Sequence, residues 1–182
     1  MKIKIGIICG DENWMKWLAD FLKKQGDMII AGTAMSKEAG IQLAHTGLID
    51  IFLVDVNLPE NKYDGIFCTA EISQFSKAKV IMVSSLEDEA VILHAFSAGA
   101  VNYILKDNYL DIPKAIRSVY YRVSPLEVLA RNFAGQMVER LLQVLTPSEK
   151  EVFDDISRRY KLPPFKKHYK AISTLKCQEI IN

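Results

Sequence analysis

The sequence predicts an α/β protein built on a doubly wound parallel sheet, and three observations lead to that fold class. Short apolar segments alternate five times with segments of helical periodicity along residues 1–122. Several of the short segments are apolar throughout, which is typical of parallel strands buried on both faces. The 182 residues are 49% hydrophobic, enough to fill the core of such a domain. We therefore expect five strands in one parallel sheet, with helices on both of its faces.

The first two pairs of strand and helix lie within residues 4–46. Residues 4–9 are apolar and β-branched, as in a strand, and apolar residues then recur at helical spacing up to Gly26. That helical face consists of Trp14, Met15, Leu18, Phe21 and Leu22. Residues 28–34 have the pattern of a second strand. Residues 37–46 follow as a helix with apolar Ala39, Leu43 and Ala44 on one face.

The other three pairs follow with short connections. The apolar run of residues 51–54 predicts a buried third strand, and residues 66–75 a helix. Residues 80–83 form a fourth strand pattern, and residues 87–98 a helix that Gly99 ends. The last pair comprises a strand over residues 101–105 and a helix over residues 112–122.

Polar side chains follow the strands at the edge where open α/β sheets bind ligands. Asp11 and Glu12 come after the first strand and Asp55 ends the third, which would gather three carboxylates. Carboxylates this close repel one another unless a hard cation lies among them, and Mg²⁺ prefers oxygen ligands. Ser84 follows the fourth strand and Lys106 the fifth. A hydroxyl and an ammonium beside a carboxylate are the groups that a transferred phosphoryl group requires.

In this order, these residues resemble the receiver domain of two-component response regulators over about the first two-thirds of the chain. The matching positions are Asp11-Glu12, Asp55 with Pro59, Ser84 after residues 80–83, and Lys106 within residues 99–107. The resemblance implies a receiver domain of residues 1–122 with the flavodoxin-like strand order 2-1-3-4-5.

The resemblance also implies a phosphorylation site. Asp55 would accept a phosphoryl group from a sensor histidine kinase. Mg²⁺ would be held by Asp11, Glu12 or both, by Asp55, and by the backbone carbonyl of Asn57. The chain would then promote only its own phosphoryl transfer and dephosphorylation and would not be an enzyme in the usual sense.

The same resemblance assigns the residues of a switch. Ser84 would move to bond the phosphoryl oxygens and Lys106 would pair with their charge. Tyr103 takes the place of an aromatic ring whose inward or outward rotamer reports phosphorylation. The surface that changes would be the one formed by the fourth helix, fifth strand and fifth helix.

Two segments near this site depart from the receiver pattern. Receivers usually have two acids directly after the first strand, and Asp11-Glu12 fits that register only if the first helix is a residue or two shorter than usual. The other register places Gly10-Asp11 there. After Asp55, residues 61–63 make the loop about two residues longer than the common form.

The last third of the chain has a different pattern. Residues 123–144 have helical periodicity and form a linker that packs on the tail or on a second subunit. Residues 145–182 begin with Leu145-Thr146-Pro147, which resembles the opening of the helix-turn-helix domain of LuxR-type regulators. Residues 172–176 resemble the entry to that family's recognition helix, which implies that Thr174 and Lys176 would contact DNA. Pro163-Pro164 interrupts the region between.

Composition limits the remaining function classes. No apolar stretch is long enough to span a bilayer and no signal peptide pattern is present, so we expect a soluble, cytoplasmic protein. Cys9, Cys68 and Cys177 have no zinc-site spacing and are interpreted as reduced thiols. Trp14 and Trp17 are interpreted as packing residues.

Three functions fit these observations. The first is a DNA-binding transcription regulator that forms a homodimer when Asp55 is phosphorylated. The second is an atypical or truncated response regulator whose output is protein association without DNA binding. The third, least favoured, is a small α/β enzyme that hydrolyses phosphate.

Overall fold

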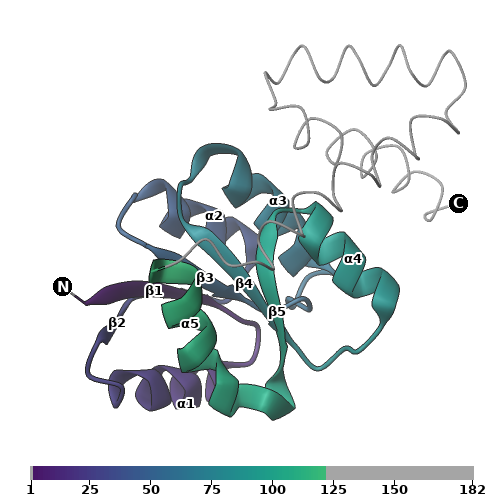
Figure 1. Ribbon diagram of the computed structural model, residues 1–182. Helices are drawn as coiled ribbons and strands as arrows, with labels where there is room; N and C mark the ends of the chain where they lie inside the picture. Colours follow the sequence, from purple (N-terminus) through teal and green to yellow (C-terminus); the bar gives the residue numbers. More distant parts are fainter. Residues whose placement is uncertain (1, 122–182) are drawn as a thin grey trace, which may run out of the picture.

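Residues 2–121 of the computed structural model form a five-stranded parallel sheet between two layers of helices (Figure 1). The strands are β1 (Ile3–Ile8), β2 (Met28–Ala34), β3 (Ile51–Val54), β4 (Lys79–Ser84) and β5 (Ala100–Leu105). The helices are α1 (Glu12–Lys23), α2 (Lys37–His45), α3 (Asp64–Phe75), α4 (Glu89–Ser97) and α5 (Ile112–Tyr121), and a 3₁₀ helix, η1 (Lys106–Asp111), precedes α5. The sheet order is β2-β1-β3-β4-β5, so the predicted fold class and strand order are confirmed.

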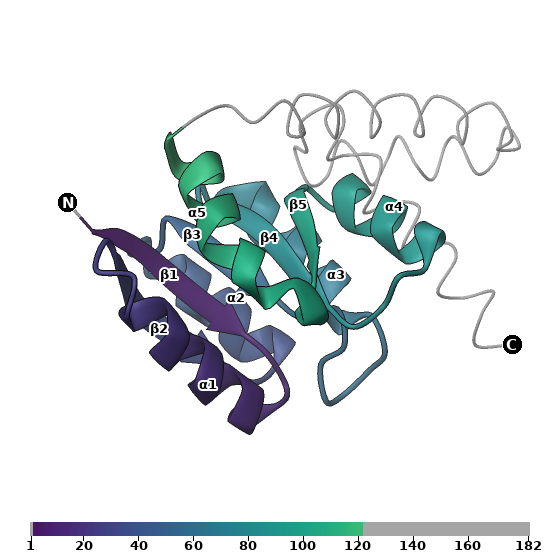
Figure 2. The same ribbon diagram turned by 60° about the horizontal axis from the view of Figure 1, so that its bottom comes forward.

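The helices divide between the two faces of the sheet, and each face has its own core. Helices α1 and α5 cover one face, and α2, α3 and α4 cover the other (Figure 2). On the α1 side, Leu18 and Ile116 pack against the β1 and β4 residues Ile5 and Ile81. Strand β3 is buried at every residue, because alternate side chains enter the two cores. This explains why its sequence is apolar throughout.

The register of the strands brings their C-terminal ends to one edge. Ile8 of β1 pairs with Val54 of β3, and Val54 pairs with Met82 of β4. Ser84, at the end of β4, pairs with Leu105 at the end of β5. The residues that directly follow β1, β3 and β5 therefore emerge at the same edge of the sheet, with the end of β4 between the last two.

Several boundaries differ from the sequence prediction. Strand β1 ends at Ile8, one residue earlier than expected, and Ser84 lies inside β4. Helix α3 begins at Asp64 after Tyr63, whose φ of 78° is a left-handed conformation that aromatic residues rarely adopt. The 3₁₀ helix η1 was not predicted.

Gly99 follows α4 with a φ of 103°, as expected for a glycine just past a helix end. The predicted linker of residues 123–144 and the helical tail of residues 145–182, with Thr174 and Lys176, lie outside the described residues. Within residues 2–121, no helix is long and apolar enough to cross a membrane.

Candidate functional site

Asp55 lies at the centre of the sheet edge and is 7% exposed. Its backbone N–H donates to the Ile8 carbonyl oxygen at 2.8 Å, so the chain continues the pairing with β1 past the end of β3. Helix α3 begins directly beneath it: a Cβ on Gly65 would collide with the Asp55 carbonyl oxygen. The backbone of Asp55 is therefore fixed from two sides, and its side chain points out of the sheet edge.

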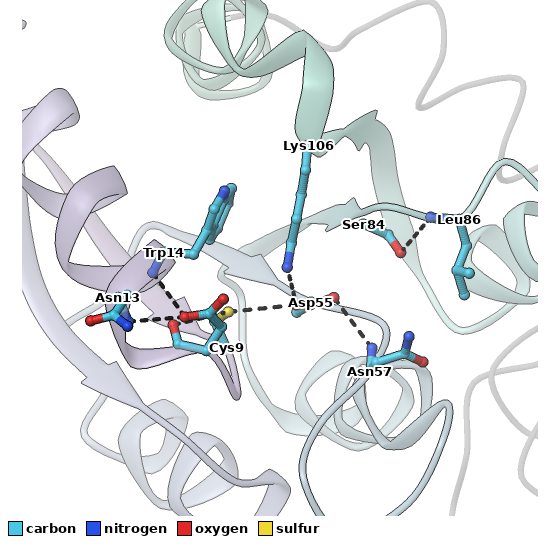
Figure 3. A network of polar contacts seen from close by, with 9 residues as sticks. Cys9, Asn13, Trp14, Asp55, Asn57, Ser84, Leu86 and Lys106 are labelled. Atoms are coloured by element: carbon cyan, nitrogen blue, oxygen red, sulfur yellow. Dashed lines mark hydrogen bonds and ion pairs between the residues drawn. The ribbon is translucent and has the colours of Figure 1, made fainter.

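Lys106 extends from the end of β5 to the Asp55 carboxylate (Figure 3). Its Nζ lies 2.6 Å from Oδ2 of Asp55, and both side chains are largely buried, with exposures of 17% and 8%. The ammonium also lies 4.7 Å from the centroid of the Trp14 ring on α1, a cation–π distance. Trp14, interpreted from sequence as a packing residue, thus contacts a site residue. No feature of the sequence predicts this contact between Trp14 and Lys106.

The residue that follows β1 contacts the same carboxylate. The Cys9 thiol lies 3.5 Å from Oδ2 of Asp55 and 3.7 Å from the Asp11 carbonyl oxygen. Burial raises the pKa of Cys9 to about 11, so the thiol stays protonated at neutral pH and donates its S–H. Cys9 and Cys68 are both buried and free. The sequence analysis treated Cys9 only as a reduced thiol, because it placed this apolar residue inside the first strand.

Gly10, the next residue in the chain, carries no side chain. A Cβ on Gly10 would lie 2.8 Å from Cδ of Pro59, in the loop that follows Asp55. Pro59 therefore occupies the space into which a side chain at residue 10 would project. The two positions directly after β1 supply one thiol and no carboxylate.

The predicted acids lie after these two residues and are engaged elsewhere. Asp11 is exposed and caps α1, where its Oδ1 accepts from the backbone N–H groups of Asn13 and Trp14 at 2.9 and 3.0 Å. Glu12 forms an exposed ion pair with Lys16 at 2.7 Å. Oδ1 of Asp55 accepts from the backbone N–H of Asn57 at 3.3 Å.

The donor set around Asp55 does not suit Mg²⁺, the cation that the receiver resemblance implies. Among residues 2–121, no group of three or more His, Cys, Asp or Glu side chains is placed to hold a metal ion. Mg²⁺ takes oxygen ligands, usually one or two carboxylates together with waters and substrate phosphates. Beside Asp55 the residues following β1 offer sulfur and no side chain, and Lys106 already supplies the positive charge.

Ser84 and Tyr103 meet at the loop after β4. Ser84 is fully buried, and its Oγ accepts from the backbone N–H of Leu86 at 3.2 Å. The Tyr103 hydroxyl donates to the carbonyl oxygen of the same residue, Leu86, at 2.8 Å. Burial raises the pKa of Tyr103, against a hydrogen bond with Ser84 that lowers it. Two of the three predicted switch residues, Ser84 and Tyr103, are thus connected through Leu86, with the Tyr103 ring half-buried.

Comparison with known proteins agrees with this geometry. The family model for the response regulator receiver domain matches residues 6–117. The response regulator protein VraR of Staphylococcus saprophyticus is 29% identical over 166 residues, which cover 88% of this chain and 78% of VraR.

Two solved structures share the fold at lower identity. The response regulator domain of Thermotoga maritima CheB has a TM-score of 0.62 at 24% identity and covers 67% of this chain and 98% of that domain. A two-component response regulator of the LuxR family from an Aurantimonas species has a TM-score of 0.62 at 20% identity, covering 66% and 86%. The chain therefore belongs to the response regulator receiver domain family of two-component systems.

Proposed function

We propose that Asp55 is the phosphoacceptor of this response regulator and that a sensor histidine kinase is its donor. The contact that supports this most strongly is the 2.6 Å ion pair between Lys106 and Oδ2 of the buried Asp55. Oδ1 accepts from the backbone N–H of Asn57 at 3.3 Å, whereas Oδ2 lies 2.6 Å from the Lys106 ammonium, so Oδ1 is the oxygen that attacks the phosphorus of the phosphohistidine. A P–O bond forms, the P–N bond breaks, and the imidazole nitrogen keeps the electron pair.

Lys106 and Ser84 stabilise the product charge. The Lys106 ammonium lies beside the carboxylate before transfer and pairs with a phosphoryl oxygen after it. For its hydroxyl to donate to another phosphoryl oxygen, Ser84 moves toward Asp55 and gives up its bond with Leu86. Tyr103 also binds Leu86, so this movement is transmitted to the Tyr103 ring. The reactions assigned to the chain are this transfer and the later hydrolysis of the acyl phosphate, in which water restores the Asp55 carboxylate and inorganic phosphate leaves.

For the output, we propose phosphorylation-dependent dimerisation and DNA binding. The likeness to VraR extends over 166 residues and therefore reaches beyond Tyr121 into the tail. Residues 145–147 resemble the start of a LuxR-type helix-turn-helix domain, and residues 145–182 carry eight basic and five acidic side chains. Thr174 and Lys176 are the proposed DNA contacts.

Protein association without DNA is the second candidate, and two observations favour it. Pro163-Pro164 interrupts the helical pattern of the tail. In the receiver domain, an open cleft of about 750 Å³ lies between α4, β5 and α5, with Phe96, Tyr103 and Ala115 among its lining residues. This cleft borders the switch residue Tyr103 and could take an apolar side chain of a partner.

Intact-mass spectrometry after incubation with acetyl phosphate tests the acceptor role. We expect the mass of one phosphoryl group on the wild-type chain and none on Asp55→Asn. Lys106→Arg is the matched control, because it keeps a cation beside the carboxylate. Equal modification of wild type and Asp55→Asn would remove Asp55 as the acceptor.

Fluorescence anisotropy with promoter fragments separates the two outputs. We expect phosphorylated protein to bind DNA with an affinity that falls steeply as salt rises, since phosphate contacts release counterions. Lys176→Ala should weaken this binding and reduce its salt dependence. Phosphorylated protein that does not bind at low salt would favour protein association.

A further inference from the structure

The charges around Asp55 already balance within the protein. Asp55 contributes one negative charge and Lys106 one positive charge at 2.6 Å. Within residues 2–121, the carboxylate also accepts from the Cys9 thiol and from the backbone N–H of Asn57, and both act as hydrogen-bond donors. A cation needs acceptors, and each of these contacts presents a hydrogen atom to the carboxylate instead.

Three features keep additional carboxylates away from Asp55. Cys9 places sulfur, a soft ligand that Mg²⁺ avoids, against Oδ2. Gly10 has no side chain, and Pro59 fills the adjoining space. Asp11, the next residue, uses its Oδ1 to satisfy two backbone N–H groups in the first turn of α1. A divalent cation at Asp55 would thus meet one carboxylate and a nearby ammonium, whose charge repels it.

From this arrangement we propose that the Asp55 site of this chain works without a divalent cation, with Cys9 in the position of a metal-binding carboxylate and Lys106 as the counter-charge that residues 2–121 supply. This proposal rests on the proposed function, in which Asp55 is the phosphoacceptor. By working without a divalent cation, the site departs from the receiver family.

The test measures metal binding with no phosphodonor present, so it can fail or succeed independently of phosphorylation. The chain has two tryptophans, Trp14 and Trp17. In the full-length Trp17→Phe protein, Trp14 is the sole tryptophan, and it lies next to Lys106 at the site. Its emission is followed during titration with MgCl₂ at constant ionic strength. Bound Mn²⁺ is counted in parallel by electron paramagnetic resonance on the wild-type chain.

We expect that MgCl₂ causes no saturable change in Trp14 emission in the Trp17→Phe protein. We also expect the wild-type chain and Asp55→Asn to bind the same amount of Mn²⁺. Cys9→Asp, introduced into the Trp17→Phe protein, should create a carboxylate pair with Asp55 and raise the affinity for Mg²⁺ by at least about tenfold. Cys9→Ser is the matched control, since it restores oxygen without charge, and should not bind. Circular dichroism and urea unfolding establish that each variant is folded.

Two results would overturn the proposal. The first is saturable Mg²⁺ or Mn²⁺ binding by the protein with Cys9 intact that is lost in Asp55→Asn. The second is a folded Cys9→Asp protein with no gain in affinity, because Cys9 would then not be what excludes the cation. The Mn²⁺ measurement needs no change at residue 9, so it decides the question even where Cys9→Asp fails to fold.

Discussion

The ion pair between Asp55 and Lys106 is a buried interaction whose two partners depend on each other. Removing Lys106 alone leaves a carboxylate of 8% exposure without its counter-charge. Burying an unpaired charge costs far more than the pair contributes, so the two single substitutions are not equivalent to the double one. The consequence can be measured as a coupling energy.

We predict that Lys106→Met lowers the free energy of unfolding by about 3 kcal/mol at neutral pH, and that adding Asp55→Asn recovers most of the loss. Urea unfolding followed by tryptophan fluorescence measures both, because the two tryptophans of the chain lie in α1. Strictly additive effects of the two substitutions would show that the pair does not stabilise the fold.

Tyr103 offers a second test at the level of one hydrogen bond. Tyr103→Phe removes the 2.8 Å bond to the Leu86 carbonyl oxygen and keeps the ring. We predict a loss of about 1 kcal/mol in urea unfolding. Ser84→Ala removes the neighbouring bond to the Leu86 N–H, and its effect should not add to that of Tyr103→Phe, because both side chains bind the same residue. Fully additive losses would argue against a connection through Leu86.

Among the elements, helix α1 depends on the residue that the sequence assigned to metal binding. Asp11 caps it through two hydrogen bonds of 2.9 and 3.0 Å. We predict that Asp11→Ala costs about 1 kcal/mol in urea unfolding, since two backbone N–H groups lose their acceptor. Asp11→Asn keeps the accepting oxygen and should cost much less. A large cost for Asp11→Asn would mean that the charge, and not the cap, matters at this position.

The strands were more predictable from sequence than the residues that follow them. Residues 51–54 coincide with β3, because a parallel strand buried on both faces is apolar throughout. Residues 28–34 coincide with β2, an edge strand in which Ile29 is exposed. The end of β1 was placed one residue late because Cys9 is as apolar as the strand before it. That end depends on pairing between Ile8 and Val54, which are 46 residues apart. The local sequence pattern does not show which distant residue a strand end pairs with.

The candidate site shows the same limit. Asp55, Ser84 and Lys106 could be identified because each closes an apolar strand, and the edge of the sheet follows from the fold class. Cys9 and Trp14 could not, because their roles come from contacts across the sheet edge, 3.5 Å and 4.7 Å long. The 3₁₀ helix η1 was also missed, since six polar and apolar residues in mixed order have no helical period.

At the scale of the whole domain, a single ion pair joins the start of β2 to α5. The Arg117 guanidinium donates to both carboxylate oxygens of Asp27, at 2.7 and 3.0 Å, and to the side chain of Gln25 at 3.2 Å. These residues are 90 positions apart in the chain. The pair thereby fixes the last helix of the domain to the edge of the sheet.

This pair predicts a pH dependence of stability. The hydrogen bond from Arg117 lowers the pKa of Asp27 in the folded state. The contribution of this ion pair to the free energy of unfolding is therefore complete above the pKa of Asp27 in the unfolded chain, about 3.9. It is lost as the pH falls through the lower pKa of the folded state. Asp27→Asn should therefore remove this part of the loss of stability below about pH 4. At pH 7 it should lower the free energy of unfolding by at most about 1 kcal/mol, because both side chains are about one-third exposed. Identical pH profiles for the two proteins would contradict this.

The contact between Gly10 and Pro59 has a consequence for redesigning the site. A carboxylate at residue 10 would need a Cβ within 2.8 Å of the proline ring, so Gly10→Asp is disfavoured for as long as Pro59 stays where it is. An acid engineered at residue 10 therefore needs a second change in the loop that carries Pro59, whereas one at residue 9 replaces a side chain that is already there.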